Sequence, residues 1–237
     1  MNIFISGTDT DIGKTFITAG LSVVMQSLGY NTAVFKPFQS GAIVKNNFLI
    51  SPDLSFIKKY DPFIETLYSY ILKTPSSPQL ACELENVEVN LDKIINDFNS
   101  LKSKCDITVT EGAGGIMVPL AKNMLTSDLI KALDLPTIFV IRPNLGTINH
   151  TLLTLSYAKS KGINIRGIII NNYPVENDDI IIKTAPRLIK EYFDVEFLGT
   201  IPHCDKQPNA SQLIDIFINN VDFEKVFDIK IPKLVKN

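Results

Sequence analysis

The stretch Gly7-Thr8-Asp9-Thr10-Asp11-Ile12-Gly13-Lys14-Thr15 decides the fold, because it joins a short apolar segment to a longer helix-like one. Its glycines allow close approach of the backbone, and its amides and the following helix start present partial positive charge. Lys14 can reach the β- and γ-phosphates of a nucleotide, and the Thr15 hydroxyl can ligate Mg²⁺. The stretch predicts a phosphate loop with one residue more than usual between its glycines. A glycine-rich turn with a chance Lys-Thr pair is the alternative.

Short apolar segments rich in β-branched residues alternate with longer segments of mixed polarity along the chain. Segments that are apolar on successive residues are typical of strands covered on both faces. We expect strands at 2–6, 32–35, 107–110, 137–141, 166–170 and 196–198. We expect helices at 15–28, 91–101, 127–133, 149–161 and 178–192. This alternation predicts an α/β fold of the P-loop NTPase kind, with a mostly parallel sheet and helices on both faces.

The length of 237 residues suits one large α/β domain covering 1–237. Within it, residues 40–90 are less regular, and prolines at 62, 75 and 78 interrupt the pattern. We therefore expect this segment to be a surface excursion of a single domain rather than a second domain.

Composition and charge exclude several classes of protein. The chain has 23 basic and 25 acidic residues, which leaves no broad basic surface for duplex DNA or an anionic membrane. No apolar stretch approaches the roughly 20 residues that cross a bilayer, and the first residues lack the features of a secretory signal. Cys82, Cys105 and Cys204 stand far apart, so neither a disulfide framework nor a zinc site is indicated. We expect a soluble cytoplasmic protein that binds neither nucleic acid nor membrane.

Two charged residues follow expected strands, at the sheet edge where ligands of parallel sheets bind. Glu111 precedes a glycine-rich turn and is a candidate Mg²⁺ partner, because this cation takes oxygen ligands and nucleotide phosphates. An acid at a helix start is the alternative. Lys36 opens Lys-Pro-Phe-Gln-Ser-Gly and could neutralise charge on a phosphoryl group, although a solvated lysine would look the same. Asp53, after Ser-Pro, is on these grounds an ordinary helix start.

Amide side chains and free backbone amides mark two further strand ends. Asn171 and Asn172 suit the edge of a purine, but are equally good turn formers. Residues 146–149, Gly-Thr-Ile-Asn, could bind a carboxylate through backbone amides, or simply cap a helix.

Four of these segments together resemble the dethiobiotin synthetase family. They are GTDTDIGKT at 7–15, KPFQSG at 36–41, EGAGG at 111–115 and GTINH at 146–150. The resemblance extends along nearly the whole chain. It implies an ATP-dependent cyclo-ligase of biotin synthesis that converts 7,8-diaminononanoate and CO₂ to dethiobiotin, with ADP and phosphate as the other products. The route passes through a carbamate and a carbamic-phosphoric anhydride, in an active homodimer whose substrate site lies at the subunit interface.

The resemblance also implies roles for individual residues. Lys36 and Lys14 would be the catalytic cations, and Thr15, Asp53 and Glu111 would surround Mg²⁺. The residues expected to contact ATP are Asp11, Ile12, Gly13, Lys14, Thr15, Phe16, Asp53, Glu111, Gly112, Ala113, Gly114, Asn171, Asn172, Pro202, His203 and Cys204. The residues expected to contact the diamine are Thr10, Ser40 and Gly115, together with Gly146, Thr147, Ile148 and Asn149 of a second subunit.

The sequence departs from the family at two of these places. Asp11 stands where the longer glutamate is often found, and Gln79 follows Ser-Pro where a histidine is common. The substrate supplies both amines, so positioning and charge neutralisation suffice, and neither His150 nor His203 is expected to be a catalytic base.

Two other functions fit the same fold. A dimeric switch ATPase of the partition or site-selection type carries a signature lysine in its loop, but that position is Asp9 here. A related ATP-dependent synthetase would differ only in its substrate.

Overall fold

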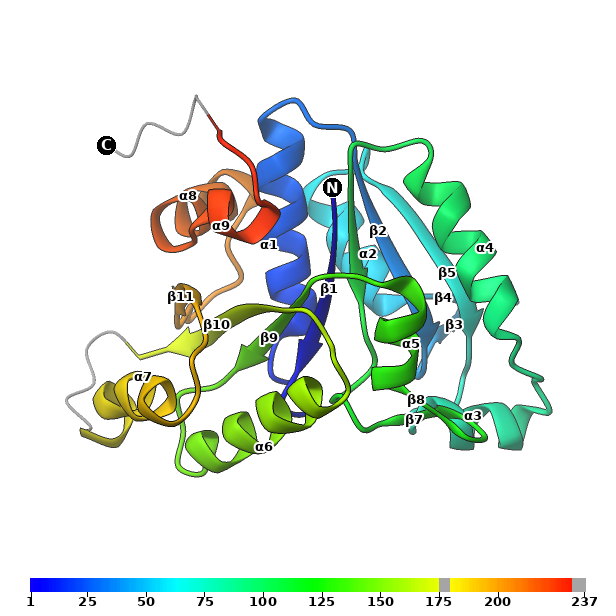
Figure 1. Cartoon of the computed structure of the whole chain (residues 1–237). Helices are drawn as coiled ribbons and strands as arrows, with labels where there is room; N and C mark the ends of the chain where they lie inside the picture. Colours follow the sequence, from blue (N-terminus) through cyan, green and yellow to red (C-terminus); the bar gives the residue numbers. More distant parts are fainter. Residues whose placement is uncertain (175–179, 232–237) are drawn as a thin grey trace.

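A seven-stranded parallel sheet forms the centre of the computed structural model, which describes residues 1–174 and 180–231 (Figure 1). The strand order is β11-β10-β9-β1-β6-β2-β5. The strands are β1 Asn2–Gly7, β2 Thr32–Gln39, β5 Glu65–Ile71, β6 Ile107–Glu111, β9 Thr137–Ile141, β10 Ile165–Tyr173 and β11 Phe197–Pro202. The predicted fold class, a mostly parallel sheet of the P-loop kind, is confirmed.

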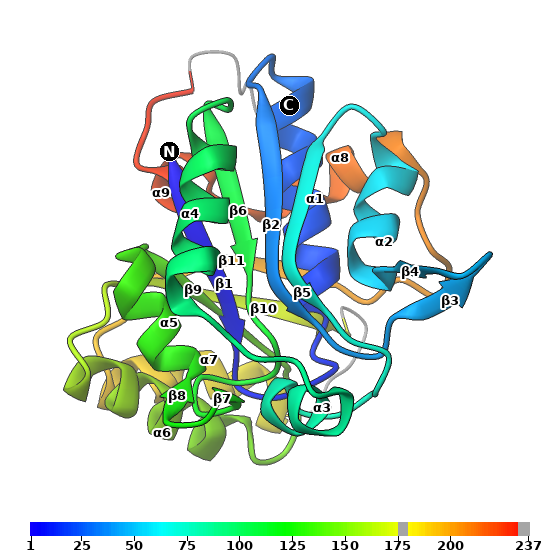
Figure 2. The ribbon, with the colours of Figure 1, turned by 90° about the vertical axis from the view of Figure 1, so that its right-hand side faces the viewer.

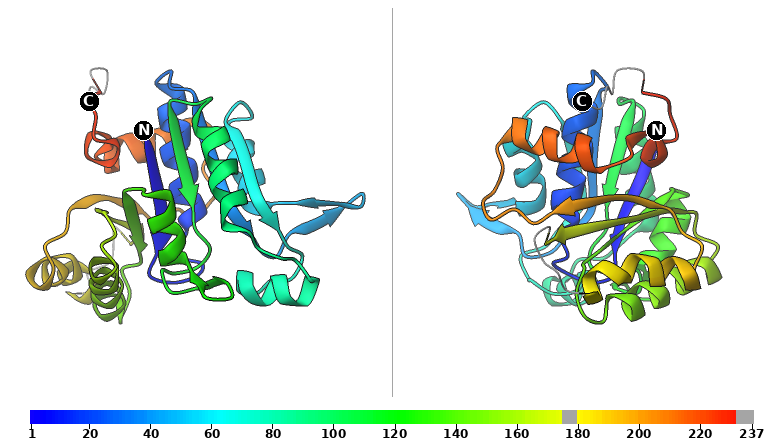
Figure 3. Two further views of the ribbon diagram at one scale, coloured as in Figure 1. Left: turned by 45° about the vertical axis from the view of Figure 1, so that its right-hand side comes forward. Right: turned by 90° about the vertical axis from the view of Figure 1, so that its left-hand side faces the viewer.

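Helices cover both faces of this sheet (Figure 3). Alternate residues of a strand point to opposite faces, so Ile3 and Ile5 of β1 belong to one core cluster and Phe4 to the other. The first cluster takes side chains from α1 Lys14–Ser27, α2 Pro52–Tyr60, α8 Ala210–Asn220 and α9 Phe223–Phe227. The second takes side chains from α3 Pro78–Glu85, α4 Leu91–Lys102, α5 Thr126–Leu133, α6 Thr147–Ser160 and α7 Ile180–Tyr192.

The expectation for residues 40–90 is wrong in one respect, because this segment adds an edge strand to the main sheet. β5 pairs in parallel with β2 from Ala33↔Glu65 to Gln39↔Ile71. Its exposed edge position allows polar residues between the apolar ones, so the segment lacks the continuous apolar pattern used to find the other strands. The segment does include a surface feature, since β3 Ile43–Lys45 and β4 Phe48–Ile50 form a hairpin that projects from the body (Figures 2 and 3).

Several element boundaries also differ from expectation. β2 continues to Gln39, so Lys36 lies within the strand and not after it. The helix expected at 178–192 is described from Ile180, and residues 178 and 179 lie outside the described part of the chain. The short hairpin of β7 Pro119–Ala121 and β8 Met124–Leu125 and the two last helices were not anticipated. Among the described residues, no helix has the length and apolar character to span a bilayer.

Candidate active site

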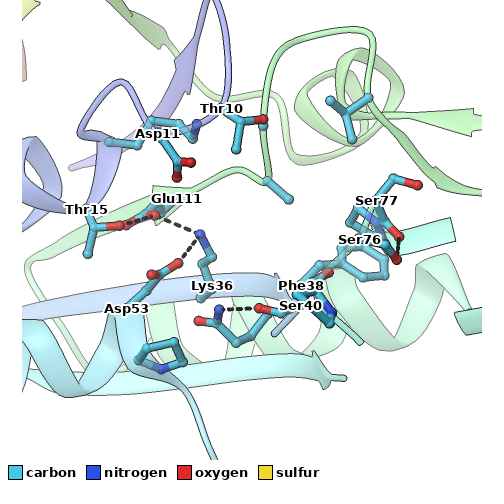
Figure 4. A pocket seen from close by; sticks show the side chains of 18 of the residues that line it. Thr10, Asp11, Thr15, Lys36, Phe38, Ser40, Asp53, Ser76, Ser77 and Glu111 are labelled. Carbon is cyan, nitrogen blue, oxygen red and sulfur yellow. Dashed lines mark hydrogen bonds and ion pairs between the residues drawn. The ribbon is translucent and has the colours of Figure 1, made fainter. Parts of the chain in front are cut away.

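A cavity of about 780 Å³ opens where β1, β2 and β6 end (Figure 4). Because these strands are parallel neighbours, their carboxyl ends and the loops that follow lie at one edge of the sheet. The phosphate-loop segment, the end of β2 and the start of α2 line the cavity, together with residues near the start of α3 and the turn after β6. The predicted site residues that line it are Thr10, Asp11, Gly13, Lys14, Thr15, Lys36, Ser40, Asp53, Glu111, Ala113 and Gly114.

Lys36 is a buried cation held between two carboxylates. The residue is 4% exposed, which excludes the solvated-lysine alternative. Its Nζ lies 2.7 Å from Glu111 Oε1 and 2.7 Å from Asp53 Oδ2, and it donates to the Gly112 carbonyl at 3.2 Å. Burial alone would lower the pKa of Lys36, but the two carboxylates outweigh this effect and raise it above the usual value. Lys36 is therefore charged at neutral pH.

Glu111 presents one free oxygen beside this lysine. It ends β6, is 1% exposed, and accepts hydrogen bonds at Oε1 from Thr15 Oγ1 (2.9 Å) and from Lys36. Its Oε2 is buried and has no hydrogen-bond partner among residues 1–174 and 180–231. A buried carboxylate oxygen without a partner is costly unless a ligand satisfies it. The alternative of an acid at a helix start is excluded, because a glycine turn and not a helix follows.

The groups around Glu111 match the requirements of Mg²⁺. The described part of the chain contains no cluster of three or more His, Cys, Asp or Glu side chains that could enclose a metal. Mg²⁺ does not need such a cluster, because it is usually bound by one or two carboxylates with waters and phosphate oxygens. The Thr15 hydroxyl, the Asp53 carboxylate and the unpaired Oε2 of Glu111 are donors of that kind. The residues present therefore fit the ion that the sequence predicts.

Lys14 lies in the same cavity, but its pKa is shifted in the opposite direction to that of Lys36. Its Nζ donates to the backbone carbonyl of Asp9 at 3.0 Å. Burial lowers its pKa to about 8, and the nearby charge of Lys36 acts in the same direction. The acids Glu111, Asp53 and Asp11 oppose this shift but do not cancel it. An anion in the cavity would restore the charge of Lys14.

The phosphate-loop segment is shaped by Gly13 and by one side chain from β10. Gly13 has φ +88°, in the left-handed region, and a Cβ added there would lie 2.0 Å from Asn171 Nδ2. Asn171 is buried, and its Nδ2 donates to the carbonyl of Ile12 at 2.9 Å. We expected Asn171 either at the edge of a purine or as a turn former, and in the structure its amide nitrogen also supports the phosphate loop. The Ile12 side chain is buried, so only its backbone remains for a nucleotide.

A second cavity of about 430 Å³ lies where β9, β10 and β11 end. The predicted residues that line it are Phe16, Asn171, Asn172, Pro202 and Cys204. His203 is not among the lining residues, and its Nδ1 contacts Asn172 Oδ1 instead. Five further lining residues were not predicted from the sequence: Phe56, Arg142, Lys206, Gln207 and Pro208. Of these five residues, only Arg142 could have been predicted, because it directly follows the expected strand 137–141.

The predicted substrate residues of the second subunit lie apart from Lys36 within one chain. Gly146 precedes α6, and residues 146–149 line neither of the two cavities described above. Gly115 lines a third cavity of about 420 Å³ together with His150 of α6. The prediction places residues 146–149 beside the substrate that is bound to the partner subunit.

Comparison with known proteins identifies the family. A family model described as an AAA domain matches residues 1–211. The ATP-dependent dethiobiotin synthetase BioD of Clostridium novyi is 38% identical over 231 residues, which cover 94% of this chain and 96% of the relative. The protein of the same name from Methanocaldococcus jannaschii is 39% identical over 203 residues, which cover 84% and 92%. The chain belongs to the dethiobiotin synthetase family. The predicted family and enzyme class, an ATP-dependent ligase of biotin synthesis, are confirmed.

The solved structures similar to this family member share its fold at much lower identity. The MinC:MinD cell division complex of Aquifex aeolicus matches with a TM-score of 0.61 and 14% identity, covering 100% of this chain and 98% of that chain. The ParA family ATPase of Chlorobium tepidum matches with a TM-score of 0.58 and 13% identity, covering 90% and 97%. At these identities the likeness establishes the fold alone. The switch-ATPase alternative therefore shares the architecture of this chain, while the close sequence relatives are synthetases.

Proposed function

We propose that this member of the dethiobiotin synthetase family forms dethiobiotin from 7,8-diaminononanoate, CO₂ and ATP. The observation that carries the proposal is the buried Lys36 between Glu111 and Asp53, next to Lys14 and Thr15 of the phosphate-loop segment. A fixed positive charge beside an anion-binding loop is what the transfer of a phosphoryl group requires.

The reaction proceeds in three steps. One amine of the diamine adds to CO₂ and loses a proton, which gives a carbamate. A carbamate oxygen then attacks the γ-phosphorus of ATP, the bond from that phosphorus to the β-phosphate oxygen breaks, and ADP leaves. Finally the second amine attacks the carbonyl carbon of the anhydride, phosphate leaves, and loss of a proton completes the ureido ring. The chain supplies positioning and charge, and no protein nucleophile takes part.

Six side chains of the first cavity have parts in this scheme. Lys14 and the amides of residues 11–15 bind the β- and γ-phosphates, while Lys36 balances charge on the transferred group. Thr15, Glu111 and Asp53 hold Mg²⁺, which neutralises phosphate charge when bound. The buried Ser40 hydroxyl borders the cavity and has no partner in the described part of the chain, so it is placed to contact the diamine or its carbamate.

The second cavity suits the nucleoside part of ATP. Its volume lies in the range of small-ligand sites, and the aromatic side chains of Phe16 and Phe56 offer apolar walls for a base. Amides from Asn171, Asn172 and Gln207 line the same space and can donate to or accept from the base edge. Phe16 follows Thr15 directly in α1, so one nucleotide can reach from the loop into this cavity.

The proposed active form is a cytoplasmic homodimer in which residues 146–149 of one subunit receive the substrate carboxylate bound to the other. Exposed Leu145 directly precedes these residues and exposed Leu153 lies on α6, while exposed Met117 lines the third cavity together with Leu153. Contact with a second subunit would cover these apolar side chains. The three cysteines are free, as in proteins of reducing compartments. A fully active preparation with the mass of one subunit, or recovery of the protein with cell membranes, would contradict this part.

The dependence of ATP hydrolysis on the other substrates tests the proposed function. With Mg²⁺ present, we expect ATP consumption to require both diaminononanoate and bicarbonate, and to match dethiobiotin production mole for mole. Omitting either one should leave only background hydrolysis, because the carbamate is the phosphoryl acceptor. A rate of ATP hydrolysis that does not depend on the diamine but increases when DNA or lipid is added would favour a switch ATPase instead.

The low pKa of Lys14 predicts that nucleotide binding weakens at alkaline pH. Lys14 is charged below its pKa of about 8 and neutral above it, so a nucleotide that binds above pH 8 must also drive the uptake of a proton. The charged groups that face it are Lys36, Glu111, Asp53 and Asp11. We expect the dissociation constant for ADP, measured by calorimetry, to rise about fivefold from pH 8 to pH 9. Lys14→Arg, which stays charged, should show no such rise, and an equal rise in both proteins would contradict the assignment.

A further inference from the structure

Gln39 connects two segments that carry predicted site residues. It is the last residue of β2 and is 4% exposed. Its Nε2 donates to the carbonyl of Ser40 at 2.8 Å, and its Oε1 accepts a hydrogen bond from the Ser51 hydroxyl. A buried neutral amide with both ends engaged holds its neighbours in one arrangement. Gln39 thus joins the end of β2 to the residue that precedes α2.

The hydroxyl of Ser51 is the N-cap of α2. It accepts a hydrogen bond from the backbone amide of Leu54 at 3.1 Å and donates its proton to Gln39, so it acts as donor and acceptor at the same time. Asp53 lies two residues further on, in the first turn of the helix, with its carboxylate 2.7 Å from Lys36 Nζ. The contact with Gln39 therefore fixes the turn from which Asp53 reaches Lys36.

The chain between Gln39 and Ser51 contributes little to fixing the position of the first turn of α2. It forms the projecting hairpin of β3 and β4, in which Ile43, Val44 and Phe48 are exposed (Figure 2). An isolated two-stranded hairpin is marginally stable by itself. Leu54 in the first turn and Ile57 in the next anchor one side of α2 in the core, while the Ser51 cap sets how the helix begins on the side that carries Asp53.

We propose that Gln39 is a positioning residue for phosphoryl transfer, which acts through Ser51 to hold Asp53 against Lys36. This inference rests on the proposed function of Lys36 and Asp53 as parts of the reaction site. Loss of the Gln39 contact frees the Ser51 hydroxyl and loosens the first turn of α2. Asp53 then spends less time beside Lys36 and is less available to a bound metal ion.

A double-mutant cycle tests the proposal on the full chain. Gln39→Met keeps the length of the side chain and removes both hydrogen bonds. We expect it to lower kcat about tenfold and to raise the Mg²⁺ concentration for half-maximal activity, with a smaller change in the KM for the diamine. In an Asp53→Asn background the same substitution should change kcat less than about twofold, because its effect passes through Asp53. A tenfold loss in both backgrounds, or no loss in either, overturns the proposal.

Substitutions at Ser51 and Ser55 distinguish an effect on the position of Asp53 from a general loss of stability of α2. Ser51→Ala should reproduce the kinetic effect of Gln39→Met, and Ser51→Thr, which keeps a hydroxyl, should restore activity. Ser55 donates to the Ser51 carbonyl at 2.7 Å in the same turn but does not touch Gln39, so Ser55→Ala should leave kcat unchanged. Loss of activity in Ser55→Ala equal to that in Gln39→Met would point to helix stability alone and overturn the proposal.

Failure of the proposed function would be recognised separately, because the unmodified protein would then make no dethiobiotin. In that case the readout of the same double-mutant cycle is the dissociation constant for ADP in the presence of Mg²⁺. Gln39→Met should weaken Mg²⁺-dependent binding in the wild-type background and not in Asp53→Asn. Equal weakening in both backgrounds, or none, again overturns the role of Gln39.

Discussion

Lys36→Ala is expected to lower kcat by about 10²- to 10³-fold, with little change in the KM for the diamine. The reason is that Lys36 is the one cation held between Glu111 and Asp53 in the described cavity, where a low dielectric strengthens its effect on the transferred phosphoryl group. Product formation in a coupled dethiobiotin assay gives kcat and KM together. Near-normal turnover would show that the catalytic cation lies elsewhere.

The same substitution is also expected to reduce stability, because it leaves the buried carboxylate of Glu111 without its cation. Breaking a buried ion pair by removing one partner costs about 3 to 5 kcal/mol of unfolding free energy. Kinetics are therefore compared at a temperature at which denaturant unfolding shows the variant to be folded. Lys36→Met combined with Glu111→Gln should recover part of the stability but not the activity. Lys45→Ala, at the exposed tip of the hairpin, is the matched control and should change neither quantity.

Gly13→Ala is expected to weaken ADP binding about 10- to 100-fold. The new Cβ would lie 2.0 Å from Asn171 Nδ2, and φ at this position is +88°, a conformation that alanine adopts at a cost of about 1 to 3 kcal/mol. The loop must move away from Asn171, and its amides then no longer converge on the phosphates. Calorimetry with ADP measures the loss directly.

A second glycine in the chain separates backbone strain from steric clash. Gly29 has φ +92° with nothing within 4 Å of an added Cβ, so Gly29→Ala carries the strain without the clash. We expect Gly29→Ala to lower stability by about 1 kcal/mol and to leave ADP binding intact. Asn171→Ala should partly restore binding to Gly13→Ala, since it removes the obstructing amide. Equal binding losses in Gly13→Ala and Gly29→Ala would contradict the steric explanation.

The phosphate loop, Lys36 and Glu111 could be placed from the sequence because each lies near the carboxyl end of an apolar strand, and parallel strands end at one edge of the sheet. Asp53 could not be placed in this way. Its position depends on how α2 begins after an irregular hairpin, which no periodic pattern describes. From its sequence context alone, Asp53 was interpreted as an ordinary helix start, and only the family resemblance identified it as a candidate site residue.

Three other features were missed for different physical reasons. β5 was overlooked because an edge strand tolerates the polar residues that interrupt an apolar pattern. Gln39 was overlooked because a buried amide acts through partners distant in sequence, here Ser51, and has no sequence signature of its own. Lys206, Gln207 and Pro208 of the second cavity were overlooked because they come from the loop between β11 and α8, whose course the pattern of strands and helices does not determine.

The residues that line the two cavities come from different parts of the sequence. The lining of the first comes entirely from residues 10–118, whereas most of the lining of the second comes from residues 142–208. Under the proposed assignment of the second cavity to the nucleoside, selection can alter base preference through substitutions in the second half of the chain without changing the charged residues of the first cavity. Exchange of carboxyl-terminal halves between homologous genes would transfer base preference and preserve the reaction, provided that Asn171 still meets Ile12.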